Sequence, residues 1–187
     1  MEIFKVILEI KNSFTSKRTS EAELWRMMYE ILLGLSYLHS NNIIHRDLKP
    51  LNIFLTSNQS IKIGDLGVSR IVTSNDYEKN TVSIKNDARV GTPLFLAPEL
   101  VKQKPYDFKI DIWAVGIIMY YLSTLKLPFL GENLSKLATS ITASTPKDPP
   151  KIYTDKFRNC ILSFLSKNPK ERPSADEAIE LIPELTK

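Results

Sequence analysis

The chain has little of several things that mark particular protein classes. Cys160 is the one cysteine among 187 residues, so no disulfide can form within the chain and a reducing compartment is expected. The longest uncharged apolar run, 112–122, is too short for a membrane-spanning helix. The N-terminus carries acidic residues and has no small-residue cleavage site, unlike a signal peptide. We therefore expect a cytoplasmic protein with no membrane partner.

An excess of charge of one sign is also missing. The 25 basic and 21 acidic residues leave a net charge of +4, and no run of five basic residues occurs. No aromatic platform accompanies the basic residues, so we expect no nucleic-acid partner. The apolar content of 43% and charged content of 25% are ordinary globular values. These values exclude intrinsic disorder, collagen and coiled coil as descriptions of the whole chain. Its length suits one domain, or one domain and a fragment of another.

Apolar residues repeat at helical spacing through much of the chain. Ser20 and Glu23 fit a capping box that opens a helix ending near Ser40, and Gly34 within it indicates close packing. Other helices are predicted at 1–12, 111–124, 134–143, 157–165 and 174–182. Short β-type runs occupy 43–44, 53–55 and 61–63, with a hairpin turn at 56–59 and a loop over 70–90. The predicted fold class is mainly α with a small β portion.

Three ordered motifs carry the chemistry. They read HRDLKPLN at 45–52, DLG at 65–67 and APE at 97–99. Their order and spacing resemble the protein-kinase signature set H-R-D-L-x-x-x-N, D-F-G and A-P-E. The resemblance covers 1–187 and implies a kinase C-terminal lobe, with a catalytic loop at 45–52, an activation segment at 65–99 and a helical remainder at 100–187.

The resemblance also implies roles for individual residues, with ATP and Mg²⁺ as the cofactors. Asp47 matches the catalytic aspartate that accepts the proton of the substrate hydroxyl. Asn52 and Asp65 match the two Mg²⁺ ligands, and oxygen donors suit this hard cation. Lys49 would lie near the γ-phosphate and neutralise developing charge. Lys49 and Asn52 thus belong to both the catalytic set and the ATP–Mg²⁺-binding set.

Two features indicate the kinase subclass. Lys49 and the run GTPLFLAPE at 91–99 resemble serine/threonine kinases, in which the residue matching Thr92 contacts the catalytic aspartate. Protein substrates with Ser or Thr are therefore implied. The runs 52–55, 62–70 and 90–96 resemble the NIMA-related family, in which Leu66 also replaces the usual Phe. This family resemblance allows nuclear, centrosomal or ciliary association.

Four residues match structural positions of the family. Asp111, in the run DIWAVG at 111–116, would hold the catalytic loop through its backbone. Glu99 and Arg172 match a buried ion pair, although two solvated surface charges are the alternative. His45 is expected to support its loop by packing, and His39, near a helix end, to be structural or dipole-stabilising.

The predicted activation segment contains the candidate regulatory residues. Arg46 and Arg70 could pair with a phosphate there. The candidate acceptors are Thr73, Ser74, Thr81 and Ser83. Ala88 stands where many relatives carry a phosphorylatable threonine, so the alternative is a polar loop with no regulated site.

None of the six glycines forms the G-x-G-x-x-G loop of a kinase small lobe, and the residues before Lys5 leave no room for one. We expect a large lobe alone, with an N-terminal kinase lobe encoded upstream as its partner. The isolated chain should bind Mg-ATP weakly and lack useful activity, and its uncovered interface should expose Ile44, Phe54 and Leu66. Two hypotheses remain: part of an active serine/threonine kinase, or a truncated, non-catalytic interaction module.

Overall fold

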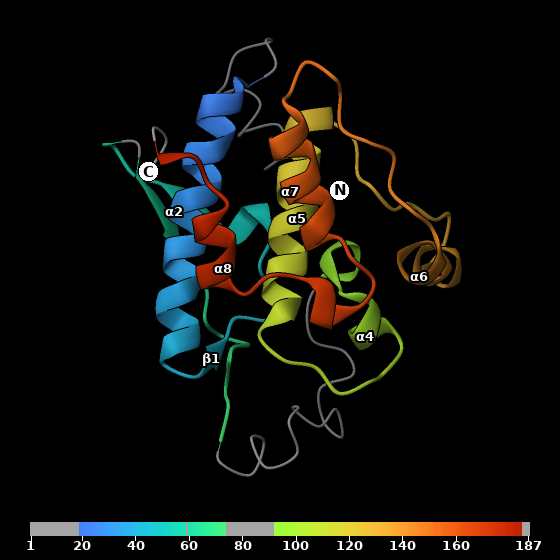
Figure 1. Cartoon of the computed structure of the whole chain (residues 1–187). Helices are drawn as coiled ribbons and strands as arrows, with labels where there is room; N and C mark the ends of the chain where they lie inside the picture. The colour runs from blue at the N-terminus through green and yellow to red at the C-terminus, as the bar shows by residue number, and fades with distance from the viewer. Residues whose placement is uncertain (1–18, 59, 74–91, 185–187) are drawn as a thin grey trace.

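A computed structural model describes residues 19–58, 60–73 and 92–184 (Figure 1). Its helices are α2 (Glu21–Ser40), α4 (Pro98–Val101), α5 (Lys109–Thr124), α6 (Leu134–Ala143), α7 (Asp155–Phe164) and α8 (Ala175–Glu180). Short 3-10 turns occupy Pro50–Asn52, Pro93–Phe95 and Pro169–Glu171. The described part is mostly helical with little β structure, as predicted. The helix predicted at 1–12 lies outside the described residues.

Helix α2 begins and ends close to the predicted residues. The Ser20 hydroxyl accepts a hydrogen bond from the Glu23 amide at 3.3 Å, which satisfies one free donor of the first turn. The Glu23 carboxylate binds Arg26, so only this half of the predicted capping box is formed. The apolar stripe of α2 is buried, and the chain leaves the helix at Asn42, whose φ is 59°. This positive φ turns the backbone towards the next strand.

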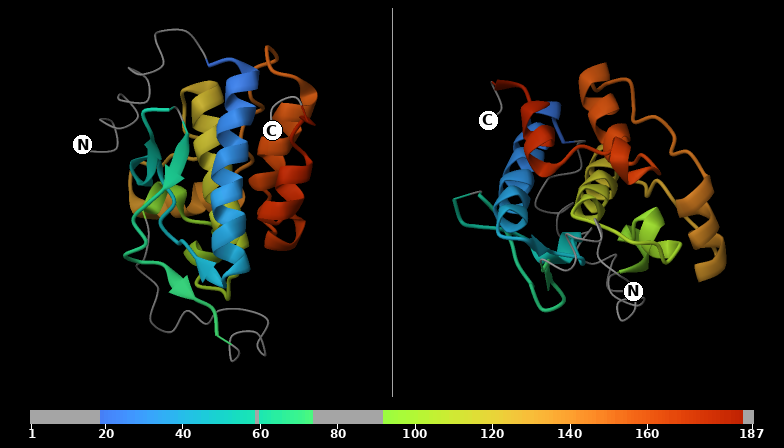
Figure 2. Two further views of the ribbon diagram at one scale, coloured as in Figure 1. Left: turned by 90° about the vertical axis from the view of Figure 1, so that its left-hand side faces the viewer. Right: turned by 60° about the horizontal axis from the view of Figure 1, so that its bottom comes forward.

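Helix α5 is the central element of the core. It is buried on nearly every side, and Trp113 has no exposed surface. Helices α2 and α7 pack against it, and Figure 2 shows the three running side by side. An all-round apolar helix must lie at the centre of a domain, as predicted. It begins at Lys109, two residues before the predicted start, and Leu125 ends it with a φ of 58°.

Two small antiparallel sheets lie beside the helices. Strand β2 (Ile53–Leu55) pairs with β3 (Ile61–Ile63), which confirms the predicted hairpin. Strand β1 (Ile43–Ile44) pairs with β4 (Arg70–Ile71), so the prediction of a loop was wrong at residues 70–71. Two residues are too few to carry a β period, and each residue of β4 pairs with a residue 26 or 28 positions earlier in the chain.

Close packing holds the hairpin against α2. A Cβ at Gly34 would lie only 2.9 Å from Ile63 Cδ1, so a side chain there would force the Ile63 side chain to shift. The Glu30 carboxylate accepts a hydrogen bond from the Ile61 amide at 2.5 Å. Both contacts fix the position of β3 along α2, and therefore the position of the 65–67 motif that follows β3.

The C-terminal part closes the helical layer. Helix α8 contacts α2 and has a complete capping box between Ser174 and Glu177, as predicted. It ends at Glu180, two residues before the predicted end. Within the described residues, no helix has the length and apolarity needed to cross a bilayer.

Candidate active site

The backbone of the 45–52 loop is held by one buried carboxylate. Asp111, in the first turn of α5, is 1% exposed. Its Oδ2 accepts from the His45 amide at 2.9 Å and its Oδ1 from the Arg46 amide at 3.0 Å. His39 Nε2 lies 2.9 Å from the same Oδ2. These contacts hold Arg46 at a φ of 68°, a costly conformation for a residue with a side chain.

The His45 ring supports the 45–52 loop through two hydrogen bonds in the interior. It is fully buried, and its Nε2 lies 3.0 Å from the Gly64 carbonyl, just before the 65–67 motif. Its Nδ1 accepts a hydrogen bond from the Asp47 amide at 3.3 Å. Both bonds form together in the tautomer that carries the proton on Nε2. The ring therefore connects the 45–52 loop with the end of β3.

Four polar groups converge on Asp47. Lys49 Nζ donates to Oδ2 at 2.5 Å. The amide and the hydroxyl of Thr92 donate to Oδ1 at 3.0 and 3.1 Å. Asn52 Nδ2 donates to the Asp47 carbonyl at 2.8 Å and approaches Oδ2 at 3.4 Å. The carboxylate is thus oriented by groups from the loop and from a segment 45 residues away.

Asn52 and Asp65 are brought near one another by the backbone. The Gly64 amide donates to the Asn52 carbonyl at 2.9 Å, so the residue before Asp65 is bonded to Asn52. Asn52 is buried and uses its amide N–H on the Asp47 carbonyl, which leaves its Oδ1 as an acceptor. Asp65 is exposed, with a φ of 60°, and one oxygen accepts from the Gly67 amide at 3.3 Å.

The donor set of these two residues fits Mg²⁺. They supply one amide and one carboxylate oxygen, and Mg²⁺ takes few protein ligands because it keeps waters and binds phosphate oxygens. In the part of the chain that the structure describes, no three His, Cys, Asp or Glu residues gather as a metal site.

Glu99 and Arg172 form a bidentate ion pair in the interior. Arg172 NH1 and NH2 lie 2.6 and 2.7 Å from the two carboxylate oxygens, and the residues are 4% and 1% exposed. Arg172 Nε also donates to the Ser166 carbonyl at 2.8 Å. The pair ties the start of α4 to the segment before α8, across 73 residues. Two solvated surface charges, the alternative considered for these residues, do not describe this geometry.

Comparison with known proteins identifies the family. The protein kinase domain family matches residues 2–181. This chain belongs to the protein kinase family. The kinase motifs of the sequence, at 45–52, 65–67 and 97–99, all lie within the matched range.

This kinase domain is similar to serine/threonine kinases of the NIMA-related type. It is 39% identical to serine/threonine-protein kinase Nek3 of Oryza sativa subsp. japonica over 161 residues, 86% of this chain and 26% of that protein. It is 36% identical to serine/threonine-protein kinase Nek4 of Mus musculus over 154 residues, 82% and 19% of the two chains. Probable serine/threonine-protein kinase nek3 of Dictyostelium discoideum is 40% identical over 179 residues, 93% and 15%. The chain spans about a quarter or less of these curated relatives.

Only some of the candidate regulatory residues of the kinase are described. Arg46 Nε donates to the Val68 carbonyl at 2.6 Å, and its NH1 lies 3.5 Å from the Tyr106 hydroxyl. Arg70 lies in β4, and Thr73 is the last residue before a gap in the description. The candidate acceptors Ser74, Thr81 and Ser83 lie outside the described residues, as does Ala88.

Sequence reasoning missed one contact of the site and left another unspecified. Tyr106 is buried and meets Arg46 from 60 residues away, and no motif around Tyr106 indicates this. His39 was expected to be structural or dipole-stabilising, and it contacts Asp111 across 72 residues. The His39–Asp111 contact depends on how α2 and α5 pack, and the Tyr106–Arg46 contact on how the segment before α5 meets the 45–52 loop; local patterns record neither.

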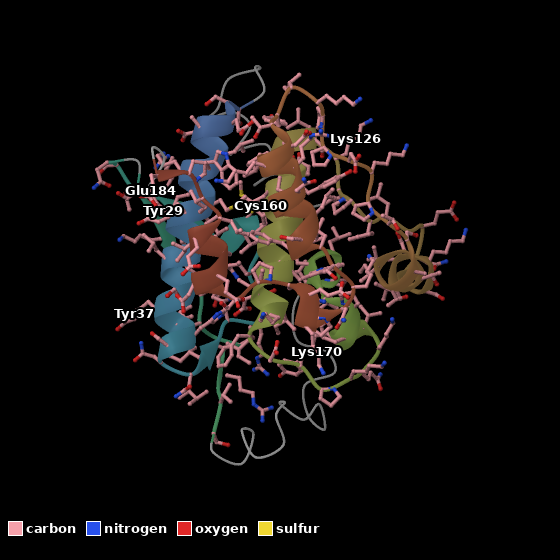
Figure 3. All side chains as sticks on the ribbon, viewed as in Figure 1. Tyr29, Tyr37, Lys126, Cys160, Lys170 and Glu184 are labelled. Carbon is pink, nitrogen blue, oxygen red and sulfur yellow. The ribbon has the colours of Figure 1, made fainter. Side chains whose placement is uncertain are left out.

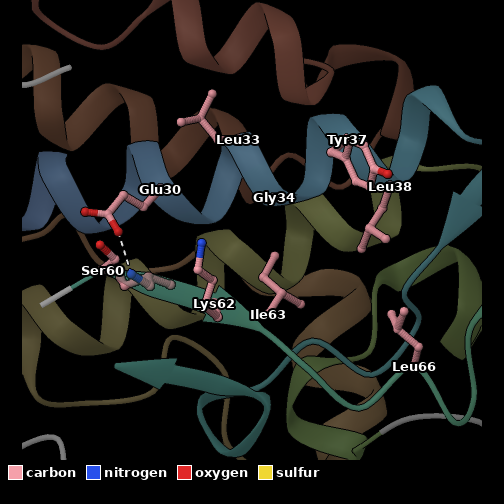
Figure 4. Close-up of a pocket in the computed structure, with 10 residues that line it drawn as sticks. Glu30, Leu33, Gly34, Tyr37, Leu38, Ser60, Lys62, Ile63 and Leu66 are labelled. Carbon is pink, nitrogen blue, oxygen red and sulfur yellow. Dashed lines mark hydrogen bonds between the residues drawn. The ribbon is translucent and has the colours of Figure 1, made fainter. Parts of the chain in front are cut away.

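Beside the site lies an exposed apolar face. Leu66 of the DLG motif is 47% exposed and Phe54 is 53% exposed, as expected. The expectation for Ile44 was wrong: it is fully buried, because β1 packs against α2. A pocket of about 590 Å³ opens between α2 and β3, lined by Leu33, Leu38, Ile63 and Leu66 among others (Figure 4).

Proposed function

We propose that this kinase domain transfers the γ-phosphoryl group of ATP to serine and threonine hydroxyls of proteins. The observation that carries the proposal is the Asp47 carboxylate, oriented by Lys49, Asn52 and Thr92 within 3.4 Å. Phosphoryl transfer has a loose, highly charged transition state, so its catalysts mainly position groups and neutralise charge. A fixed carboxylate beside a fixed ammonium suits both tasks.

In this proposal Asp47 orients the substrate hydroxyl and accepts its proton. The hydroxyl oxygen forms a bond to the γ-phosphorus while the bond to the β–γ bridging oxygen breaks. The Thr92 donors hold Oδ1, which keeps the carboxylate plane constant during the proton transfer. Lys49 is a point charge beside Oδ2 and stabilises negative charge on the transferring group.

Asn52 and Asp65 would hold Mg²⁺ in this proposal. Bound there, the metal would neutralise charge on the donor phosphates. Asn52 is buried and pre-oriented by its bond to the Asp47 carbonyl, whereas Asp65 is exposed and its carboxylate has one longer hydrogen bond, from the Gly67 amide at 3.3 Å. Metal binding would therefore have to order the Asp65 side chain more than the Asn52 side chain.

The exposed apolar face is proposed as the surface that an N-terminal kinase lobe packs against. Phe54, Leu66 and the pocket beside α2 form apolar surface that a second lobe would cover. The proposal expects the 187-residue chain by itself to bind Mg-ATP weakly and to lack useful activity, since the Gly-rich loop and strand lysine of a small lobe supply donor contacts.

The test compares the chain alone with the chain joined to the small lobe of rice Nek3, its 39%-identical relative. Transfer from labelled ATP to a generic protein substrate should be absent for the chain alone and present for the fusion. Asp47→Asn in the fusion should reduce transfer at least about 10³-fold. Asp155→Asn is the matched control, because Asp155 is exposed at the start of α7, pairs only locally with Arg158, and should leave transfer unchanged.

Each other outcome contradicts a defined part of the proposal. Low-micromolar Mg-ATP binding by the chain alone would contradict the need for a second lobe. Full activity of the Asp47→Asn fusion would contradict the assigned catalytic role. An inactive fusion, beside an active intact rice kinase, would favour the alternative of a non-catalytic interaction module.

A further inference from the structure

Away from the proposed site, one lysine amine connects three parts of the fold. The rings of Trp113, in α5, and Phe129 are stacked with centroids 5.4 Å apart. Lys167 Nζ lies over them, 3.6 Å from the Phe129 centroid and 4.9 Å from that of Trp113. The same Nζ donates to the Ile141 carbonyl, in the last turn of α6, at 2.7 Å. Cation–π attraction and this hydrogen bond together attach the C-terminal end of α6 to the two rings. We call this set of Lys167 contacts the latch.

Helix α6 has few other attachments. It lies at the edge of the molecule in Figure 1, and it contacts α4. Only Leu137 and Ile141 of its ten residues are buried. The last carbonyls of a helix have no partner within it, so the Lys167 ammonium satisfies one of them. Loss of this charge should therefore destabilise the C-terminal end of α6 more than it destabilises the core.

The surroundings of Lys167 also alter its acid–base chemistry. Burial, the Arg172 guanidinium and the Lys102 ammonium lower the pKa of Lys167 to about 8. Among the described residues, no carboxylate lies within salt-bridge distance of it, so only the two rings and the Ile141 carbonyl favour its charged form. Lys167 remains partly exposed, so a small reagent can reach it. By contrast, burial raises the pKa of the Cys160 thiol to about 12, which leaves that residue inert.

We propose that Lys167 is an acylation site, modified by a small acyl phosphate, and that its acylation releases the C-terminal end of α6. The lone pair of the neutral amine attacks the acyl carbon and forms the C–N bond. The C–O bond to phosphorus breaks, phosphate leaves with the electron pair, and the amine proton passes to water. The product is a neutral amide, which cannot form the cation–π contacts with Phe129 and Trp113.

The first test measures acetylation of the intact 187-residue chain by acetyl phosphate, followed by peptide mass spectrometry. Lys170 is the internal control, because it is exposed and three positions away (Figure 3). At pH 7.5 roughly a quarter of an amine with a pKa near 8 is neutral, against about 0.1% for an ordinary lysine. Nucleophilicity falls with pKa, as for thiols, so Lys167 should react about tenfold faster than Lys170.

The same comparison at pH 9.5 separates reactivity from simple access. There the ratio of the two rates should fall to about one. An ordinary lysine is then about a tenth neutral, and the greater nucleophilicity of a more basic amine offsets the remaining difference in neutral fraction. A lysine modified faster for reasons of exposure alone would keep its advantage at both pH values. Modification of Lys167 no faster than Lys170 at pH 7.5, or a ratio unchanged at pH 9.5, would overturn the proposed site.

The second test addresses the release of α6 by amide hydrogen exchange. Lys167→Gln mimics the neutral amide and should raise exchange at the C-terminal end of α6 at least about threefold, without changing exchange in α5. Lys167→Arg retains the charge and should exchange like the wild type, as should the control Lys170→Gln. Equal α6 exchange in Lys167→Gln and Lys167→Arg would overturn the latch, whether or not Lys167 is acylated.

Discussion

Two regions of this kinase domain treat their carboxylates in opposite ways. In the buried frame, made of Asp111, Glu99 and Arg172, every carboxylate oxygen receives at least one hydrogen bond from the protein. On the open face, made of Asp65, Phe54 and Leu66, the one carboxylate has a single backbone contact at 3.3 Å. The two apolar side chains beside it are about half exposed.

The difference indicates that the two regions have different roles. A buried charge is retained only when its partners replace water, so the frame residues set backbone positions and have no capacity left for a ligand. An exposed carboxylate costs little to leave unpaired, so Asp65 keeps free oxygens. Asp47 lies between these extremes, because Lys49, Asn52 and Thr92 orient its carboxylate and the proposed function directs it towards a substrate hydroxyl.

The largest expected effect removes a partner inside the frame. Arg172→Ala should lower the free energy of unfolding by about 3–5 kcal/mol, because it leaves the Glu99 charge buried and unpaired. Urea unfolding measures the loss. The control, Lys170→Ala, changes an exposed neighbour and should stay within about 0.5 kcal/mol. A loss below about 1 kcal/mol for Arg172→Ala would mean that the pair does not hold the frame together.

The next effect compares the two regions through the same substitution. Asp111→Asn should cost about 2 kcal/mol, since an amide cannot accept from the His45 and Arg46 amides on both of its heavy atoms. Asp65→Asn should cost no more than about 0.5 kcal/mol. Equal losses for the two variants in urea unfolding would remove the distinction between frame and face.

A third effect reports whether water reaches the core between α7 and α2. The Cys160 thiol lies between α7 and α2, 3.8 Å from Met28 Sδ (Figure 3). Burial raises its pKa from 9.0 to about 12, so between these pH values the folded state keeps a proton that the unfolded state loses. Stability should therefore fall as pH rises from 9 towards 12, by up to about 1.4 kcal/mol per pH unit. The difference between wild type and Cys160→Ala isolates this slope, and parallel curves would show that water reaches the thiol.

The smallest effect on stability is expected on the open face. Leu66→Ser should change the free energy of unfolding by no more than about 0.5 kcal/mol, because the side chain is 47% exposed. Light scattering should nevertheless show less self-association, since apolar surface is removed. The contrasting variant is Leu35→Ser, fully buried in α2, which should cost several-fold more. A loss above about 1.5 kcal/mol for Leu66→Ser would place Leu66 in the frame.

Local patterns predicted much of the fold. Apolar spacing and capping residues indicated α2, α5, α6 and the β2–β3 hairpin close to their observed bounds. They failed where the deciding partner is distant. Strand β4 is two residues long and exists through pairing with β1, and Ile44 is buried because α2 covers that strand. Neither fact has a signature in the neighbouring residues.

The candidate site divides in the same way. The order of the motifs in the sequence nominated Asp47, Asn52 and Asp65, because phosphoryl transfer needs a base and oxygen ligands in a constrained arrangement. The contacts of Tyr106 with Arg46 and of His39 with Asp111 join segments 60 and 72 residues apart. Hydrogen bonds depend on ångström distances, and these are set only when helices pack.

The sequence by itself nominated Asp47, Asn52 and Asp65 as site residues and determined which faces of the helices are apolar, since both follow from residue type and spacing. Only the tertiary structure decided that His39 would contact Asp111, that Tyr106 would contact Arg46, and that Lys167 would lie over two stacked rings near the end of α6. The physical reason is that burial and hydrogen-bond geometry are properties of packed elements. No segment possesses them until its distant partners are in place.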